Sequence, residues 1–146
     1  MLVVAIGGII AATVWQVRDL TPSKPGAYFT TDDGKHWFKD DPQKVTPFDY
    51  GGKQAVRAHI FRGQDGKEFV GYLTRHTPQA AEVIRKVQNR KPTDPPPTPA
   101  EMGLAQGGRE FKRPGDSEWV PMQRGAAVQK ITNITSPDGT PAVEVE

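Results

Sequence analysis

The sequence predicts an α+β protein, in which an apolar, transmembrane-type N-terminal helix precedes a small antiparallel sheet of hairpins with one main helix and one or two short helices. Three observations lead to this prediction. Residues 1–17 carry no charged side chain. Three later stretches place strand-forming residues on both sides of a glycine-containing turn, which is typical of hairpins. Residues 77–90 carry apolar side chains at helical spacing. We therefore divide the chain into an anchor, residues 1–20, and a small domain, residues 21–146.

The apolar stretch has the composition of a membrane anchor. As a helix, residues 1–17 would reach roughly 26 Å, close to the hydrocarbon core of about 30 Å. Trp15 would lie at the interface, and Arg18 follows it. Small residues four apart would let another helix approach. The residues predicted to form the anchor or an assembly contact are Leu2, Val3, Val4, Ile6, Gly7, Gly8, Ile9, Ile10, Ala11, Val14 and Trp15.

Two other interpretations of residues 1–17 remain open. A cleavable signal peptide would carry a basic region before the apolar run, and this chain has none. The stretch could instead pack against neighbouring subunits, as in the core of a pilin-like filament. Pilin subunits typically carry glutamate at the fifth position, where this chain has Ala5, and residues 21–26 would end a helix early.

Composition excludes several function classes. The chain has 14 prolines and 15 glycines, so turns and loops should be frequent. It has no cysteine, which excludes disulfides, thiolate metal sites and thiol nucleophiles. Its formal net charge of +2 is too small to indicate a nucleic-acid partner. The composition is that of one small domain that follows the apolar stretch.

The first predicted hairpin spans residues 28–38, YFTTDDGKHWF. Gly34 can adopt the positive φ of a tight turn. Thr30, Asp32, Gly34 and Trp37 also match the Asp-box of sialidase-type propellers, in which the carboxylate ties the turn and the tryptophan packs beneath it. A single box cannot form a propeller, so we predict a structural role for these residues.

Two further hairpins follow. Residues 55–61 alternate, with Arg57, His59 and Phe61 on one face, and they pair with residues 68–74 at the centre of the sheet. Residues 109–122 form a third hairpin, in which Phe111 and Trp119 repeat the spacing of the aromatic pair in the first. We expect both aromatic hairpins to cover the core.

The remaining segments are predicted from capping and turn signals. Thr77 caps the main helix, residues 77–90, and Pro78 suits its first turn. Residues 92–99 form a stiff polyproline connector, and residues 98–101 form a capping box for a short helix to about residue 105. Residues 125–131 form one or two helical turns, and residues 141–146 form a final exposed or edge strand.

The order of these motifs resembles that of small uncharacterised membrane-anchored proteins of planctomycete bacteria. The resemblance rests on AYFTTDDGKHWF, FVGYLTRHTPQA and REFKRPGDSEWV after the apolar stretch, and it covers nearly the whole chain. Members often carry cysteines in the loop formed here by residues 63–67, and this chain lacks them. The resemblance implies a location in the bacterial cell envelope and no activity.

No catalytic motif is present, so we predict a non-enzymatic structural or interaction subunit of a larger cell-envelope assembly. Residues 1–17 would contact the membrane or neighbouring subunits, with the domain outside the cytoplasm or in an extracellular filament. We expect no cofactor, metal or nucleic acid. The alternatives are a filament-forming subunit and, third, an enzyme with a dispersed site. His36, His59 and His76 lack metal-ligand spacing, but His59 or His76 with a nearby carboxylate could form such a site.

Overall fold

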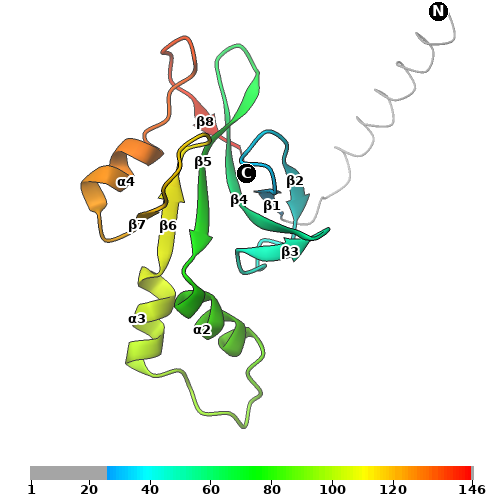
Figure 1. Ribbon diagram of the computed structural model, residues 1–146, viewed down its shortest axis with the longest axis vertical. Coiled ribbons are helices and arrows are strands. Elements are labelled where there is room, and N and C mark those ends of the chain that lie inside the picture. Colours follow the sequence, from blue (N-terminus) through cyan, green and yellow to red (C-terminus); the bar gives the residue numbers. More distant parts are fainter. Residues whose placement is uncertain (1–25, 146) are drawn as a thin grey trace, which may run out of the picture.

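The computed structural model describes residues 26–145, and these residues form one sheet with three helices (Figure 1). The strands are β1 (Ala27–Thr30), β2 (Phe38–Asp40), β3 (Phe48–Tyr50), β4 (Lys53–Arg62), β5 (Glu68–His76), β6 (Arg109–Lys112), β7 (Val120–Pro121) and β8 (Val143–Glu144). The helices are α2 (Pro78–Gln88), α3 (Pro99–Gly107) and α4 (Gly125–Thr132).

The sheet is antiparallel and is centred on the β4–β5 hairpin. Its strand order is β2-β1-β4-β5-β6-β7, and β3 and β8 also pair with β4. β4 and β5 are the longest strands, with 10 and 9 residues. The sequence predicted this hairpin at the centre of the sheet, and the strand pairing agrees with that prediction.

Strands from the two ends of the described chain lie on the same edge of β4. β1 pairs through Tyr28 and Ala58, whereas β8 pairs through Glu144 and Phe61. β5 occupies the opposite edge of β4 over this whole stretch. The gap between β1 and β8 therefore falls at His59, where the candidate site begins.

The core contains two clusters. Ala27, Phe29 and Ala55 form one, and Ala58, Ile60 and Leu73 form the other. Phe38 and Phe48 pack against the first cluster, and Trp37 and Trp119 pack against the second. The first and third hairpins therefore contribute a tryptophan to the same cluster.

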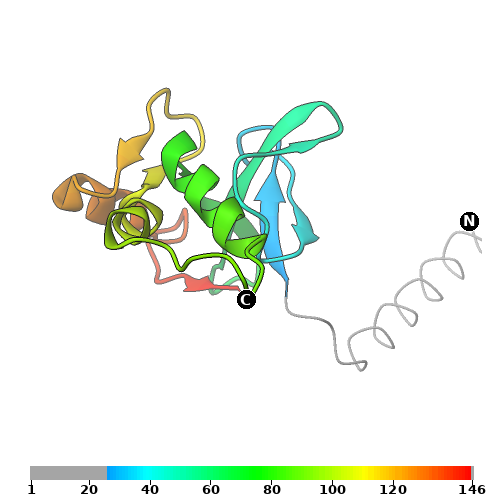
Figure 2. The same cartoon turned by 90° about the horizontal axis from the view of Figure 1, so that it is seen from below.

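The helices α2 and α3 form an arm that projects from one end of the sheet (Figures 1 and 2). The Thr77 hydroxyl accepts a hydrogen bond from the Ala80 backbone N–H at 3.2 Å and caps α2. Thr98 and Glu101 form the predicted capping box of α3. No residue of α3 is buried, so this helix depends on its cap and on α2 more than on the core.

The predicted transmembrane-type helix, membrane anchor and single-pass location are wrong for the part of the chain that the structure describes. Its helices have 11, 9 and 8 residues. At about 1.5 Å per residue the longest reaches about 17 Å, against a bilayer core of about 30 Å. Within residues 26–145 no helix is long and apolar enough to cross a membrane. The fold class is corrected to a mostly antiparallel sheet with three short helices. Residues 1–20, which were predicted to form the anchor, lie outside the described residues.

No strand was predicted between residues 40 and 53, but the structure has β3 there. The rings of Phe48 and Phe29 lie 5.1 Å apart, edge to face, so the strand is held by a residue distant in sequence.

Candidate anion-binding site

The candidate site lies on one face of the central strands. Cross-strand pairing sets Arg57 opposite Thr74, and His76 opposite Arg109. Residues that alternate along antiparallel strands share a face with their cross-strand partners. His59 and Tyr72 form another such pair one step along. The sheet therefore gathers two arginines and two histidines from three strands.

Two pockets adjoin on this face, and Arg57 and Arg109 line both. The edge pocket, of about 380 Å³, opens between the start of β1 and the end of β8 and includes His59, Tyr72 and Glu144. The inner pocket, of about 250 Å³, is bordered by the loop before β3 and by α2. Its lining includes Gln43, Lys44, Thr46, Thr74, His76 and Gln88.

The two arginines that join the pockets have no acidic partner among residues 26–145. Both are half-buried, and neither forms an ion pair or a side-chain hydrogen bond with a described residue. By contrast, Arg62 pairs with Glu68 at 2.9 Å, and Arg75 pairs with Glu110 at 3.1 Å. Among the described residues, the site therefore holds two guanidinium groups that form no ion pair.

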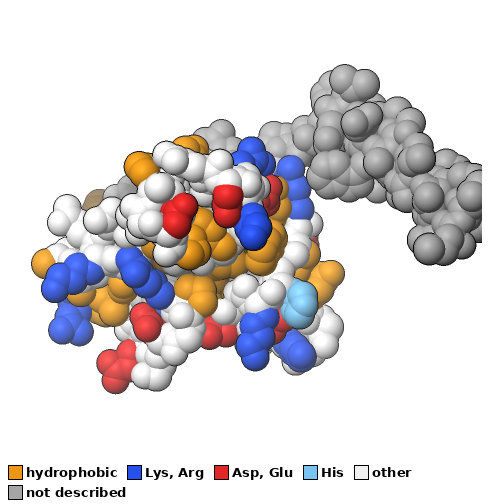
Figure 3. Space-filling model, turned by 90° about the horizontal axis from the view of Figure 1, so that it is seen from above, with side chains coloured by type: hydrophobic (Ala, Val, Ile, Leu, Met, Phe, Trp, Pro, Cys, Tyr) orange, Lys and Arg blue, Asp and Glu red, His pale blue; other side chains and the backbone are white. Residues whose placement is uncertain are grey.

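The positive charge at this site is local. The chain as a whole has a formal net charge of +2. The view of the molecule from above shows lysine, arginine, aspartate and glutamate side chains intermixed around exposed apolar surface (Figure 3). Among the described residues, Glu144 is the acidic side chain of the edge pocket and none lines the inner pocket, so positive charge exceeds negative charge at the arginine site.

His59 is held by three neighbours in the edge pocket. Its Nδ1 lies 2.7 Å from Glu144 Oε1, and its Nε2 lies 3.0 Å from the Thr74 hydroxyl. Its ring stacks on Tyr72 at 4.2 Å. Burial lowers the pKa of His59, although Glu144 acts in the opposite direction. In the neutral ring, Nδ1–H donates to Glu144 and Nε2 accepts from the Thr74 hydroxyl.

The chain of Thr74, His59 and Glu144 places a hydroxyl, an imidazole and a carboxylate in the order used by acyl-transfer enzymes. Thr74 is only 3% exposed, which leaves its hydroxyl little room to meet a substrate. The same contacts tie the short strand β8 to β4 and β5. We therefore interpret the hydrogen bonds among Thr74, His59 and Glu144 first as contacts that hold β8 on the sheet.

The other two histidines have different surroundings. His76 Nδ1 lies 3.4 Å from the Thr46 hydroxyl, at the inner pocket. Burial is the main cause that lowers the pKa of His76, and the charge of Arg109 adds to it. His36 lies in the first hairpin, where its Nδ1 is 2.6 Å from Asp32 Oδ2. Within residues 26–145 no group of three acidic or histidine side chains could hold a metal ion.

The predicted structural residues of the first hairpin lie outside the candidate site. The Asp32 carboxylate accepts hydrogen bonds from the His36 backbone N–H and the Thr30 hydroxyl, both at 2.9 Å. The backbone hydrogen bond lowers the pKa of Asp32 well below its usual 3.8. Gly34 has a φ of 86°, as the turn requires. Trp37 packs against the core.

The aromatic residues of the third hairpin lie on different faces of the sheet. The Phe111 ring lies 6.2 Å from the ring of Tyr72, which lines the edge pocket. Trp119 lies beneath Arg75, whose guanidinium is 4.3 Å from the ring centroid. The predicted anchor and assembly residues, from Leu2 to Trp15, lie outside the described residues.

Sequence reasoning did not single out Arg57, Arg109 or Glu144 as site residues. The alternation of residues 55–61 placed Arg57 on the face of His59, and that signal could have suggested a basic face. The pairing of β6 with β5, which brings Arg109 to this face, has no local signal in the sequence.

No known protein family, curated protein or solved structure that was compared with the chain matches it. The resemblance to planctomycete proteins therefore stays a prediction, and function has to be argued from the residues of the site.

Proposed function

We propose that the protein is a non-enzymatic interaction subunit of a larger assembly, and that it binds an anionic group of its partner at Arg57 and Arg109. The observation that carries the proposal is that these two half-buried guanidinium groups line adjoining pockets and have no acidic partner among residues 26–145. Arginine is the side chain best suited to bind carboxylate or phosphate groups through paired hydrogen bonds.

The energetics support an external anion. A partly buried charge without a counter-ion loses solvation energy, and no ion pair offsets that loss. An anion that enters the pockets would gain attraction in a medium that screens less than bulk water. Arg62 and Arg75 already form ion pairs within the fold, whereas Arg57 and Arg109 can still bind an external anion.

The sequence of residues 1–17 supports the assignment to an assembly. Such an apolar stretch is unfavourable in water, and burial against neighbouring subunits would remove it from solvent. The filament-forming subunit is the alternative form of this proposal. Sedimentation followed by electron microscopy distinguishes them, because a filament former should sediment as regular polymers of this chain alone.

Binding of the anionic group can be tested with synthetic peptides. Calorimetry should show that a glutamate-rich peptide binds and that the matched glutamine-rich peptide does not. The double variant Arg57→Gln/Arg109→Gln should weaken binding about tenfold or more, because charge-assisted hydrogen bonds are lost.

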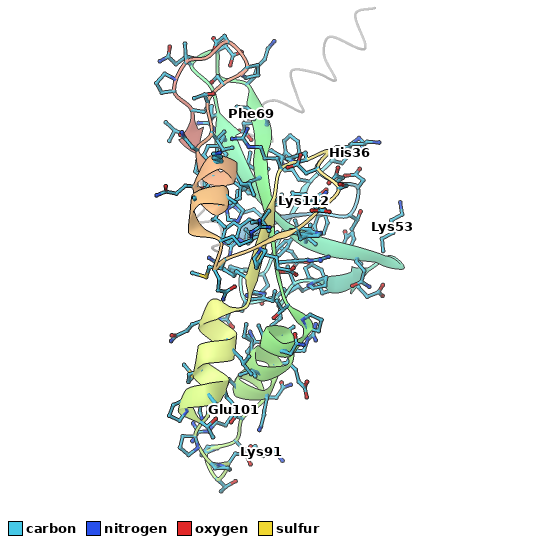
Figure 4. All side chains as sticks on the ribbon, turned by 60° about the vertical axis from the view of Figure 1, so that its left-hand side comes forward. His36, Lys53, Phe69, Lys91, Glu101 and Lys112 are labelled. Carbon is cyan, nitrogen blue, oxygen red and sulfur yellow. The ribbon has the colours of Figure 1, made fainter. Side chains whose placement is uncertain are left out.

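The control for this test is Lys53→Gln/Arg124→Gln, which removes the same charge from exposed positions. Lys53 stands at the tip of the β3–β4 hairpin, away from the arm that carries Lys91 and Glu101 (Figure 4). The affinity of this control variant for the glutamate-rich peptide should stay within about twofold of that of the parent protein, because distant exposed charges are screened by salt. If both double variants lose affinity for the peptide equally, the loss reflects net charge alone, and the proposed site is contradicted.

A dispersed enzyme is the second candidate, because Thr74, His59 and Glu144 form a connected chain. If it hydrolyses esters, the protein should cleave p-nitrophenyl acetate faster than its His59→Gln variant. Equal rates in the two proteins would exclude His59 as a catalytic base for that reaction.

A further inference from the structure

We infer that the inner pocket is a phosphate-binding subsite, which takes a phosphate monoester or free phosphate in preference to a carboxylate. This inference rests on the proposed function and specifies the anion that Arg57 and Arg109 receive. It depends on three features of the inner pocket: its donors, its charge and its separation from acidic groups.

The donors of the inner pocket come from several directions. Arg57 and Arg109 approach from β4 and β6, and His76 approaches from β5. Gln88 borders the pocket from α2, where one N–H of its amide donates to the Gln43 carbonyl at 2.7 Å and the second N–H is a further donor. Phosphate offers several strong acceptor oxygens in a tetrahedral arrangement, whereas a carboxylate presents two oxygens in one plane. Donors that surround a pocket suit the tetrahedral group better.

The charge of the pocket also matches phosphate. The two arginines that lack described acidic partners contribute two positive charges. A phosphate monoester carries about −1.5 to −2 near pH 7, so it would compensate both guanidinium groups. A single carboxylate would leave one of them uncompensated.

Of the acidic residues that the structure describes, none lines the inner pocket, whereas Glu144 lines the edge pocket. Lys44, which borders the inner pocket, is paired with Asp40 at 2.9 Å. An anion in the edge pocket would meet the Glu144 carboxylate at His59. Like charges repel, so a doubly charged anion is better accommodated in the inner pocket.

His76 provides an internal reporter of occupancy. The groups that face it are the Thr46 hydroxyl and the cations Arg57, Arg85 and Arg109. Burial and these cations lower the pKa of His76 in the free protein. A phosphate dianion beside the ring would favour the imidazolium form and raise this pKa.

The test is an NMR titration of the whole chain with inorganic phosphate and, separately, with phosphoserine. Backbone and imidazole signals report affinity, and a pH series with and without each anion reports the pKa of His76. We expect binding of one or both anions, a rise of about one unit in the pKa of His76, and at least about tenfold weaker binding by Arg109→Gln. Lys53→Gln/Arg124→Gln should bind as the parent does.

The two probes distinguish the source of the anion. Tighter binding of phosphoserine indicates a phosphate ester, and equal or tighter binding of inorganic phosphate indicates the free ion. Thermal unfolding of each variant checks that it remains folded. A second variant, His76→Gln, keeps both arginines and should retain binding within a few fold while the pKa signal disappears.

Other outcomes overturn the inference. If the glutamate-rich peptide binds but neither phosphate probe does, the phosphate subsite is wrong and the proposed interaction function stands. If neither kind of anion binds, both are wrong. If phosphate binds without a change in the pKa of His76 and equally well to Arg109→Gln, it binds elsewhere, and the inner pocket is excluded.

Discussion

Asp33 connects the first and third hairpins through its carboxylate. Lys112 Nζ donates a hydrogen bond to it, and the Gly115 backbone N–H donates another at 2.7 Å. Figure 4 shows Lys112 on β6, close to the turn that carries His36. Burial alone would raise the pKa of Asp33, but these hydrogen bonds outweigh it and hold the pKa below the usual 3.8.

Replacement of Asp33 by Asn should lower the free energy of unfolding by about 1 kcal/mol at pH 7. The figure is small because the carboxylate is 40% exposed and solvent screens the ion pair. Asn tolerates the φ of 62° at this position, so backbone strain should add little. Urea denaturation measures the difference.

The same comparison has a defined pH dependence. Because the pKa of Asp33 is lowered on folding, its stabilisation is complete above the unfolded value of 3.8 and is lost as the pH falls through the folded value. The parent and Asp33→Asn should therefore converge in acid. An undiminished difference at pH 2 would show that the ion pair is not its cause.

The half-buried histidines His59 and His76 affect stability at a higher pH than Asp33 does. Burial lowers the pKa values of His59 and His76 from 6.5, so the unfolded chain takes up protons first as the pH falls. The free energy of unfolding should therefore decrease between pH 7 and pH 5, by up to about 1.4 kcal/mol per pH unit for each proton. His59→Gln should reduce this slope. An unchanged slope in His59→Gln would contradict this assignment.

At the scale of elements, Gly71 creates the irregularity in the central hairpin. The register of β4 and β5 shifts between His59 and Ile60, where β5 contains one extra residue. A Cβ atom on Gly71 would lie 2.4 Å from Cδ1 of Phe61. The bulge lets the Phe61 ring pack over the backbone and brings Tyr72 to the face of His59.

Gly71→Ala should therefore lower the free energy of unfolding by about 1–3 kcal/mol, because Phe61 must move. Gly103→Ala in α3 is the matched change, since no atom lies within 4 Å of the added methyl group. It should raise stability by about 0.5–1 kcal/mol through helix propensity. Thermal and urea unfolding measure both changes, and a loss in both variants would contradict this assignment of Gly71.

The arm depends on its capping contacts. The Thr98 hydroxyl accepts from the Glu101 backbone N–H, and the Glu101 carboxylate accepts from the Thr98 backbone N–H, both at 3.1 Å. Glu101 also pairs with Lys86 of α2 at 3.1 Å. Hydrogen exchange in α3 should become faster in Thr98→Ala by a factor equivalent to about 1 kcal/mol. Thr98→Ser keeps the hydroxyl and should show little change.

At the scale of the whole molecule, β4 connects most of the sheet. It pairs with β1, β3, β5 and β8. Amides of β4 and β5 should therefore exchange only through global unfolding, whereas those of α3 should exchange through local opening. Native-state hydrogen exchange in low urea tests this order. Equal protection of α3 and β4 would show that the arm unfolds only with the sheet.

Local signals predicted most of the elements. Gly34 and its neighbours indicated the first turn, and Thr77 and Thr98 indicated the starts of two helices. These predictions succeeded because turn and capping preferences act over a few residues. The transmembrane-type helix was predicted from residues 1–17, and the helices that the structure describes are too short and polar to supply one. β3 was missed because Phe48 is held by a distant partner, Phe29.

The turns, the helix caps and the alternation that sets His59 and Arg57 on one side of a strand can be predicted from the sequence, because each depends on neighbouring residues. Which charges find a partner depends instead on how the strands assemble. Glu110 reaches Arg75 and Glu144 reaches His59, whereas Arg57 and Arg109 meet none among residues 26–145. That outcome depends on strand order and register, which bring Arg57 of β4 and Arg109 of β6 to one face and so create the candidate anion site.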